Sequence, residues 1–191
     1  MTSEMPNEGS DPKGLIEYVD YRDESILPEI MALVDRDLSE PYSVFTYRYF
    51  LVNWPQLCIC AIRRGELVGV VVCKAEEEPD RHNRSEYRGY IAMLAVSDSC
   101  RRRGIGSVLV KQAVQRMREL KCVEAMLETE VTNAESLRLY GRLGFARDER
   151  LVKYYLNGVD AFRLKLWFEP KNDENGDPRA NKEKSDFPQN S

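Results

Sequence analysis

The spacing of apolar side chains along the chain changes several times between a strand-like and a helix-like period. Apolar runs of strand length predict seven strands, at 15–21, 57–63, 67–75, 90–97, 122–131, 151–156 and 161–168. Apolar positions three or four residues apart predict four helices, at 26–38, 43–54, 104–120 and 133–144. This order favours an α/β fold in which one mixed sheet carries helices on both faces.

Turn-forming and polar residues predict how these elements begin and are joined. Ser25 is a suitable N-cap for the first helix. Residues 64–66 are expected to close a hairpin, and Asn157-Gly158 predicts a second hairpin between the last two strands. The hydrophilic stretch 75–86 is expected to be a surface loop.

Polar segments at both ends of the chain limit the folded part. Residues 1–14 contain little that a core would bury, and residues 170–191 are almost entirely polar. We therefore expect two disordered tails around a single domain at 15–169, because no repeat or linker interrupts that region.

Composition excludes several classes of function. A net charge of −4 argues against general nucleic-acid binding. No apolar run approaches the length of a membrane span, so we expect a cytoplasmic protein without membrane contact. The five cysteines lack metal-ligand spacing and are expected to be buried thiols. With one histidine, His82, the chain has little material for a metal site or a Ser-His-Asp triad, and we predict no metal.

The stretch 101–106, Arg-Arg-Arg-Gly-Ile-Gly, lies between a predicted buried strand and a predicted helix. Free amides at a helix N-terminus attract anions, glycine permits close approach of the backbone, and arginine binds oxyanions in a fork. The stretch therefore suits a phosphate or pyrophosphate. It lacks the Gly-Lys-Ser/Thr of a Walker loop, and Leu109 stands where a dinucleotide fingerprint needs a third glycine. A solvated arginine run before an ordinary helix remains the alternative.

Together with its neighbourhood, this motif resembles the acetyl-CoA loop of the GNAT acetyltransferase superfamily. The segment "NAESLRLYGRLGF" at 133–145 is similar to a second GNAT motif. Within the superfamily, "LSEPYS", "TYRYF", "NWPQLC", "RGYIAMLAV", "LETEV" and "YYLNGVDAFRLKLW" resemble the catalytic subunits of N-terminal acetyltransferase C, NatC. The resemblance covers residues 18–167, apart from 75–87.

This resemblance implies a GNAT fold with a mostly antiparallel sheet and one splayed pair of strands that binds acetyl-CoA. It implies transfer of the acetyl group to the α-amine of nascent protein N-termini that begin Met-Leu, Met-Ile, Met-Phe or similar. It also implies two NatC auxiliary subunits, one large and one small, and action near ribosomes. The aromatic helix at 43–54 is expected either to pack on such a partner or to belong to the core.

The resemblance also assigns the acetyl-CoA site. Strands 90–97 and 122–131 would diverge near a bulge at Leu94, so that pantetheine amides pair with Leu94 and Val96. The amides of 102–107 would bind the pyrophosphate, and an N–H near Leu94 the oxyanion. The residues assigned to the cofactor are Leu94, Ala95, Val96, Arg101, Arg102, Arg103, Gly104, Ile105, Gly106, Ser107, Asn133 and Tyr140.

For catalysis, the resemblance places the general base at Glu128 and a general acid at Tyr140. Read without the resemblance, Glu128 is a solvated charge at a strand end, Tyr140 a core tyrosine, and Asn133 an N-cap. Because no cysteine lies at a matched position, we expect direct attack in a ternary complex. The residues expected to bind the substrate N-terminus are Leu38, Glu40, Tyr42, Tyr90, Tyr154 and Tyr155.

Two other functions stay open at this point. A lysine or small-amine acetyltransferase would keep the same fold and cofactor but use a slot open at both ends. A non-catalytic protein would bind CoA and act as a scaffold, which the presence of both Glu128 and Tyr140 disfavours.

Overall fold

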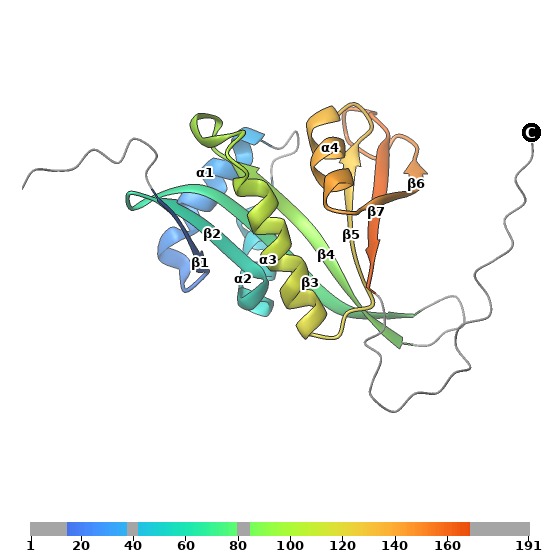
Figure 1. The fold of residues 1–191 in the computed structure, drawn as a ribbon, viewed down its shortest axis with the longest axis horizontal. Helices are drawn as coiled ribbons and strands as arrows, with labels where there is room; N and C mark the ends of the chain where they lie inside the picture. The colour runs from blue at the N-terminus through green and yellow to red at the C-terminus, as the bar shows by residue number, and fades with distance from the viewer. Residues whose placement is uncertain (1–14, 38–41, 80–84, 169–191) are drawn as a thin grey trace, which may run out of the picture.

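The computed structural model describes residues 15–37, 42–79, 85–168, which form one seven-stranded sheet with four α-helices (Figure 1). The strand order across the sheet is β1-β2-β3-β4-β5-β7-β6. The strands are β1 Ile16–Asp20, β2 Cys58–Arg63, β3 Glu66–Pro79, β4 Ser85–Val96, β5 Glu124–Glu130, β6 Ala146–Leu151 and β7 Ala161–Trp167. The expected disordered tails lie outside the described residues.

All neighbouring strands are antiparallel except β4 and β5, so the predicted mixed, mostly antiparallel sheet is confirmed. The parallel pair is short, because it begins at Arg88 with Glu124 and ends at Tyr90 with Met126. Beyond these residues β4 and β5 separate and leave a V-shaped opening in the sheet (Figure 1). This opening is the splayed pair that the GNAT resemblance implied.

A β-bulge lies at the start of the opening. Val72 of β3 pairs with Met93 and Cys73 pairs with Ile91, so Ala92 has no partner on β3. A bulged strand bends locally, which turns the second half of β4 away from β5. The bulge therefore lies two residues before Leu94, close to its expected position.

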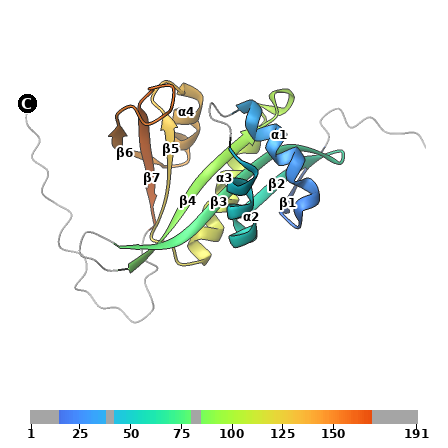
Figure 2. The ribbon, with the colours of Figure 1, turned by 180° about the vertical axis from the view of Figure 1, so that it is seen from behind.

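The helices cover both faces of the sheet. Helices α3 (Ile105–Glu119) and α4 (Ala134–Arg142) lie on one face, and α1 (Leu27–Asp37) and α2 (Val44–Asn53) lie on the other (Figures 1 and 2). Each face has its own core, because alternate residues of the central strands point to opposite sides. Val71 and Ile91 pack on the α3 side, whereas Val70 and Met93 pack on the α1 and α2 side.

The prediction of a surface loop at 75–86 is wrong for the described residues of this stretch, 75–79 and 85–86. Strand β3 continues to Pro79 and β4 begins at Ser85, so the polar stretch extends the central hairpin. Cross-strand partners explain why polar residues stay extended here: Glu76 lies opposite Arg88, and the Ser85 hydroxyl donates to Glu77 (3.0 Å).

Two element boundaries also differ from the prediction. The N-cap at Ser25 is wrong, because a 3₁₀ turn at Glu24–Ile26, capped by Asp23, precedes α1. The predicted strand 151–156 is wrong as well, since β6 ends at Leu151 and 152–160 form a loop. Asp160 stabilises this loop by accepting a hydrogen bond from the Lys153 N–H (2.7 Å).

Candidate active site

A pocket of about 500 Å³ occupies the opening between β4 and β5. Residues 90–94 of β4 and 127–130 of β5 form its two sides. Asn133, Ser136 and Tyr140 enter from α4, and the 152–160 loop contributes Tyr154 and Tyr155. Asp37 at the end of α1 and Tyr42 before α2 complete the lining. Segments that are distant in sequence therefore meet where the sheet is split.

The edge of β4 that faces the opening has backbone groups without a strand partner. Ser97 donates its N–H to Val68 on β3 (2.9 Å), so the Val96 N–H points to the opposite edge. There it donates to Oδ2 of Asp37 at 3.1 Å. The same alternation directs the Leu94 N–H into the opening. Leu94 itself lines the pocket, as expected, whereas the Ala95 side chain is buried in the core.

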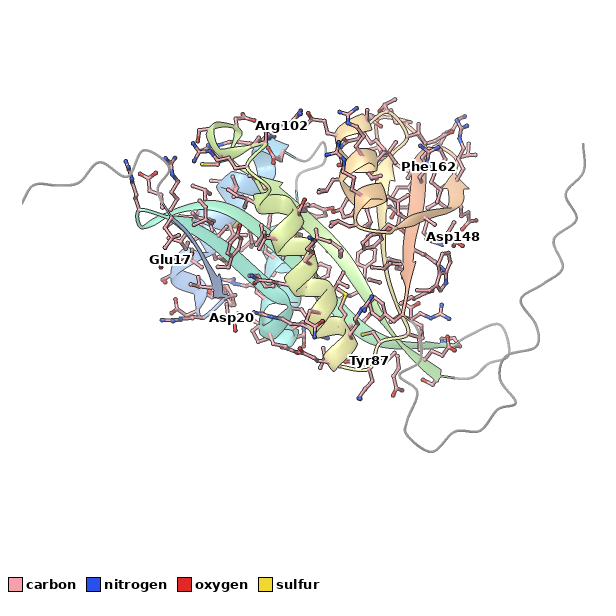
Figure 3. The ribbon with its side chains drawn as sticks, viewed as in Figure 1. Glu17, Asp20, Tyr87, Arg102, Asp148 and Phe162 are labelled. Carbon is pink, nitrogen blue, oxygen red and sulfur yellow. The ribbon has the colours of Figure 1, made fainter. Side chains whose placement is uncertain are left out.

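The loop before α3 has the backbone conformation of an anion site. Arg102 (φ 63°) and Gly104 (φ 81°) are left-handed, and Arg103 between them is not. This alternation turns successive amides to one side. Gly104 is the N-cap of α3 and supplies no side-chain cap, so the first amides of the helix, at 105–107, keep their donors. Figure 3 shows Arg102 at this end of α3, beside the opening.

The three arginines of this loop differ in their surroundings. Arg101 forms ion pairs with Asp37 (2.6 Å) and Asp98 (3.1 Å), which hold the loop against the end of α1. Arg102 is exposed and lies 3.9 Å from Glu135 of α4, and Arg103 is also exposed. Ile105 is buried beneath the loop, so only its backbone faces the anion site. The simple alternative of a solvated arginine run therefore does not describe Arg101.

Glu128 is a buried, paired carboxylate on β5. Its side chain is 6% exposed, and its Oε1 accepts a hydrogen bond from Nε of Arg163 on β7 at 2.8 Å. The Tyr90 hydroxyl of β4 lies near this carboxylate. Burial first, and then the charge of Glu128, raise the pKa of Tyr90, so the phenol remains neutral and able to donate. The interpretation of Glu128 as a solvated strand end is wrong.

Tyr140 lies on α4 and lines the same pocket. Its ring packs edge-on against Phe145 at 5.3 Å, and burial raises the pKa of its hydroxyl. The phenol therefore stays protonated at neutral pH, as a general acid requires. The interpretation of Tyr140 as a core tyrosine is confirmed, and its position in the pocket lining is compatible with the expected role as general acid. Asn133 likewise caps α4 by accepting from the Ser136 N–H (3.0 Å) and lines the pocket.

Four tyrosines expected to bind the substrate meet at the pocket: Tyr42, Tyr90, Tyr154 and Tyr155. The rings of Tyr154 and Tyr155 pack edge-on with centroids 5.1 Å apart, and Tyr154 hydrogen-bonds to Tyr90. Leu38 and Glu40 lie outside the described residues. Helix α2 contributes Tyr47, Phe50 and Leu51 to the core and leaves Phe45, Tyr49 and Val52 exposed.

Sequence reasoning missed two residues of the site, Asp37 and Arg163. Asp37 carried a signal, because a carboxylate is unfavourable at a helix C-terminus and needs compensating contacts. In the structure these contacts are Val96 and Arg101. Arg163 gave no comparable signal, since its partner depends on the register in which β5 pairs with β7.

The described residues that line the pocket are poorly suited to thiol or metal chemistry. The five cysteines are buried, and none of them lines the pocket. Burial raises the pKa of Cys60 and of Cys122 to about 11, which disfavours a thiolate nucleophile. Among residues 15–37, 42–79 and 85–168, no three His, Cys, Asp or Glu side chains gather as a metal site. In the same residues, no helix is both long and apolar enough to span a bilayer.

An open α/β sheet that splits at one parallel pair, with free helix amides at the mouth of the split, has the shape to hold an extended ligand with a phosphate end. A buried carboxylate and a buried phenol line the same pocket. The chain belongs to the acetyltransferase (GNAT) family, whose model matches residues 27–145.

Curated relatives are similar over most of this chain. N-alpha-acetyltransferase 30 of Homo sapiens is 57% identical over 152 residues, which is 80% of this chain and 41% of the human protein. N-alpha-acetyltransferase MAK3 of Arabidopsis thaliana is 54% identical over 168 residues, or 88% of this chain and 86% of the plant protein. The chain thus spans less than half of the human relative and most of the plant one.

A solved structure agrees with both the fold and the sequence. It is a crystal structure of the NatC complex bound to Gag peptide and CoA, in which the similar chain is 42% identical. The match has a TM-score of 0.75 and covers 81% of this chain and 99% of that chain.

Proposed function

We propose that this protein transfers the acetyl group of acetyl-CoA to the α-amine at the N-terminus of a protein. The observation that carries the proposal is the placement of Glu128 and Tyr140, both buried, in one pocket between the splayed strands. Pantetheine would pair with the free edge of β4 at Leu94 and Val96, where it would share or replace the contact of Asp37 with the Val96 N–H. The pyrophosphate would bind the amides at the start of α3 and the exposed Arg102 and Arg103.

The proposed chemistry is a direct transfer in which one C–N bond forms and one C–S bond breaks. An α-amine has a pKa of about 7.7–8.0, so a large fraction carries a proton that must leave before attack. Glu128 would accept that proton, directly or through a water molecule. The Leu94 N–H would stabilise the oxyanion, and Tyr140 would give a proton to the departing CoA thiolate. The second proton that the attacking nitrogen loses as the amide forms would return Tyr140 to its phenol form.

The proposed substrates are N-termini that begin Met-Leu, Met-Ile, Met-Phe or similar. Tyr42, Tyr90, Tyr154 and Tyr155 supply aromatic walls with polar ends, which suit an extended chain with an apolar second residue. We further propose that the protein is the catalytic subunit of a NatC complex with one large and one small auxiliary subunit, acting in the cytoplasm near ribosomes. The names of the relatives and of the solved complex support this assignment.

A peptide panel tests the proposal. The protein, alone and with the auxiliary subunits, is incubated with acetyl-CoA and peptides that begin Met-Leu, Ser or Met-Asp, and with a peptide whose only free amine is a lysine. We expect acetylation of the Met-Leu peptide at least about 10-fold faster than of the others, because an apolar pocket discriminates by about 1–3 kcal/mol. Faster turnover of the lysine peptide would instead establish a lysine acetyltransferase.

A further inference from the structure

Arg163 lies between two carboxylates that differ in burial. On adjacent strands, Glu128 of β5 pairs with Arg163 of β7, and Arg163 pairs with Glu149 of β6. Nε of Arg163 donates to Glu128 at 2.8 Å, and Nη1 donates to Glu149 at 3.2 Å. Glu128 is 6% exposed and Glu149 is 55% exposed. One guanidinium thus connects the pocket with the outer edge of the sheet.

The two ion pairs of Arg163 are expected to contribute differently to the free energy of the folded protein. An exposed pair contributes little because water and salt screen it, whereas a buried carboxylate depends strongly on its partner. The hydrogen bond to Glu128 is also the largest cause that raises the pKa of Arg163, ahead of the charge of Glu149. Glu149 nevertheless competes for the same positive charge.

The other titratable groups that line the pocket with Glu128 are mostly neutral. The phenols are Tyr42, Tyr90, Tyr140, Tyr154 and Tyr155. Burial is the largest cause that raises the pKa of Tyr90, Tyr154 and Tyr155, so these three carry no charge at neutral pH. The other charged residues of the pocket lining are Asp37 and Glu130. Lys165, two residues along β7, is paired with Glu124 and Asp148. Arg163 is therefore the cation in direct contact with Glu128.

We propose that Arg163 is a positioning residue that orients the carboxylate of Glu128 in the pocket, and that Glu149 competes for Arg163 from the solvent side. The catalytic meaning rests on the proposed function, whereas the orientation of Glu128 does not. Arg163 aligns one oxygen of the carboxylate, and the Tyr90 hydroxyl provides a further contact to the same group. Removal of Arg163 would leave a buried carboxylate without its cation, and removal of the Glu149 charge would strengthen the remaining pair.

Carboxyl ¹³C NMR at a fixed pH tests this proposal in the free protein, with the Glu128 signal identified by its loss in Glu128→Gln. We expect the Glu128 signal to move in Arg163→Gln, because the carboxylate loses the guanidinium that donates to it. In Glu149→Gln the signal should move less and in the opposite direction, because Arg163 then pairs with Glu128 alone. Arg163→Lys should lie between wild type and Arg163→Gln. Arg150→Gln, which breaks an exposed pair with Asp160, is the matched control and should leave the Glu128 signal unchanged.

Kinetics separate this role from a purely structural one. In Arg163→Gln we expect kcat on the Met-Leu peptide to fall by about 10-fold or more while KM for acetyl-CoA stays unchanged, because only the orientation of Glu128 is lost. Arg163→Lys should recover part of the lost kcat. An equal kcat in Arg163→Gln and wild type would contradict the proposal. If Arg163→Gln does not fold, Glu149→Gln decides alone, and an unchanged Glu128 signal in it would overturn the inference. An enzyme that acetylates no peptide while the Glu128 signals move as expected would refute only the proposed function.

Discussion

At the scale of single residues, Glu128 and Tyr140 are both buried but differ in their contacts. Glu128 is ion-paired with Arg163 and is the base that we propose, whereas burial raises the pKa of Tyr140 and keeps its phenol protonated, as the proposed acid requires. The residue types could be selected from the sequence motifs. Their contacts could not, because the sequence did not show that Glu128 is enclosed by Arg163 and Tyr90.

Replacement of the proposed base tests its role directly. Glu128→Gln keeps the shape of the side chain and removes its proton affinity, so we expect kcat on the Met-Leu peptide to fall by about 10²–10⁴. Binding of acetyl-CoA, measured by calorimetry, should change little, because the proposed cofactor contacts lie on β4 and at the start of α3. Glu77→Gln, on β3 outside the pocket lining, serves as the control and should retain full activity. Full turnover of Glu128→Gln at every pH would remove Glu128 as the base.

At the scale of elements, the loop before α3 depends on one left-handed glycine. Gly104 has a φ of 81°, and a Cβ added there would meet no atom within 4 Å. Any effect of a side chain at this position therefore comes from backbone strain or from a bound ligand. Gly65, in the turn between β2 and β3, has the same φ of 81° and the same free space.

These two glycines form a matched pair of substitutions. Gly104→Ala and Gly65→Ala should each lower the free energy of unfolding by about 1 kcal/mol, because alanine disfavours the left-handed region. Thermal or urea unfolding measures this shared cost. Only Gly104→Ala should also weaken acetyl-CoA binding, by about 10-fold in calorimetry, since it disturbs the amides expected to bind pyrophosphate. Equal affinity in both variants would argue against cofactor binding at this loop.

At the scale of the whole molecule, two cores on either side of one sheet enclose all five cysteines. Burial raises the pKa of Cys58 to about 12 and that of Cys60 and Cys122 to about 11, from an ordinary value of 9.0. Above pH 9 the unfolded chain loses these protons while the folded protein keeps them. Stability must therefore decrease as the pH rises through this range.

We expect the free energy of unfolding to fall by several kcal/mol between pH 8.5 and 10.5, at up to about 1.4 kcal/mol per pH unit for each such thiol. Urea unfolding at several pH values, in the presence of a reductant, measures the slope. Cys60→Ala should be less stable at pH 8 and should show a shallower decline. A constant stability up to pH 10 would contradict deep burial of these thiols in solution.

Six of the seven strands, the four helices and the glycine-containing loop before α3 could be predicted locally, because periodicity and helix N-termini are properties of neighbouring residues. The exceptions were the polar stretch 75–86 and the region of β6 and the 152–160 loop, whose conformations depend on partners such as Arg88 and Asp160.

The catalytic environment was decided only by the tertiary structure. Arg163 and Glu128 are 35 residues apart in the chain, and Asp37 and Val96 are 59 apart. Each pair meets because of strand register or helix docking, which no local pattern specifies. Local sequence together with the family resemblance thus singled out the proposed reacting groups and phosphate loop, and long-range packing decided which charges surround them.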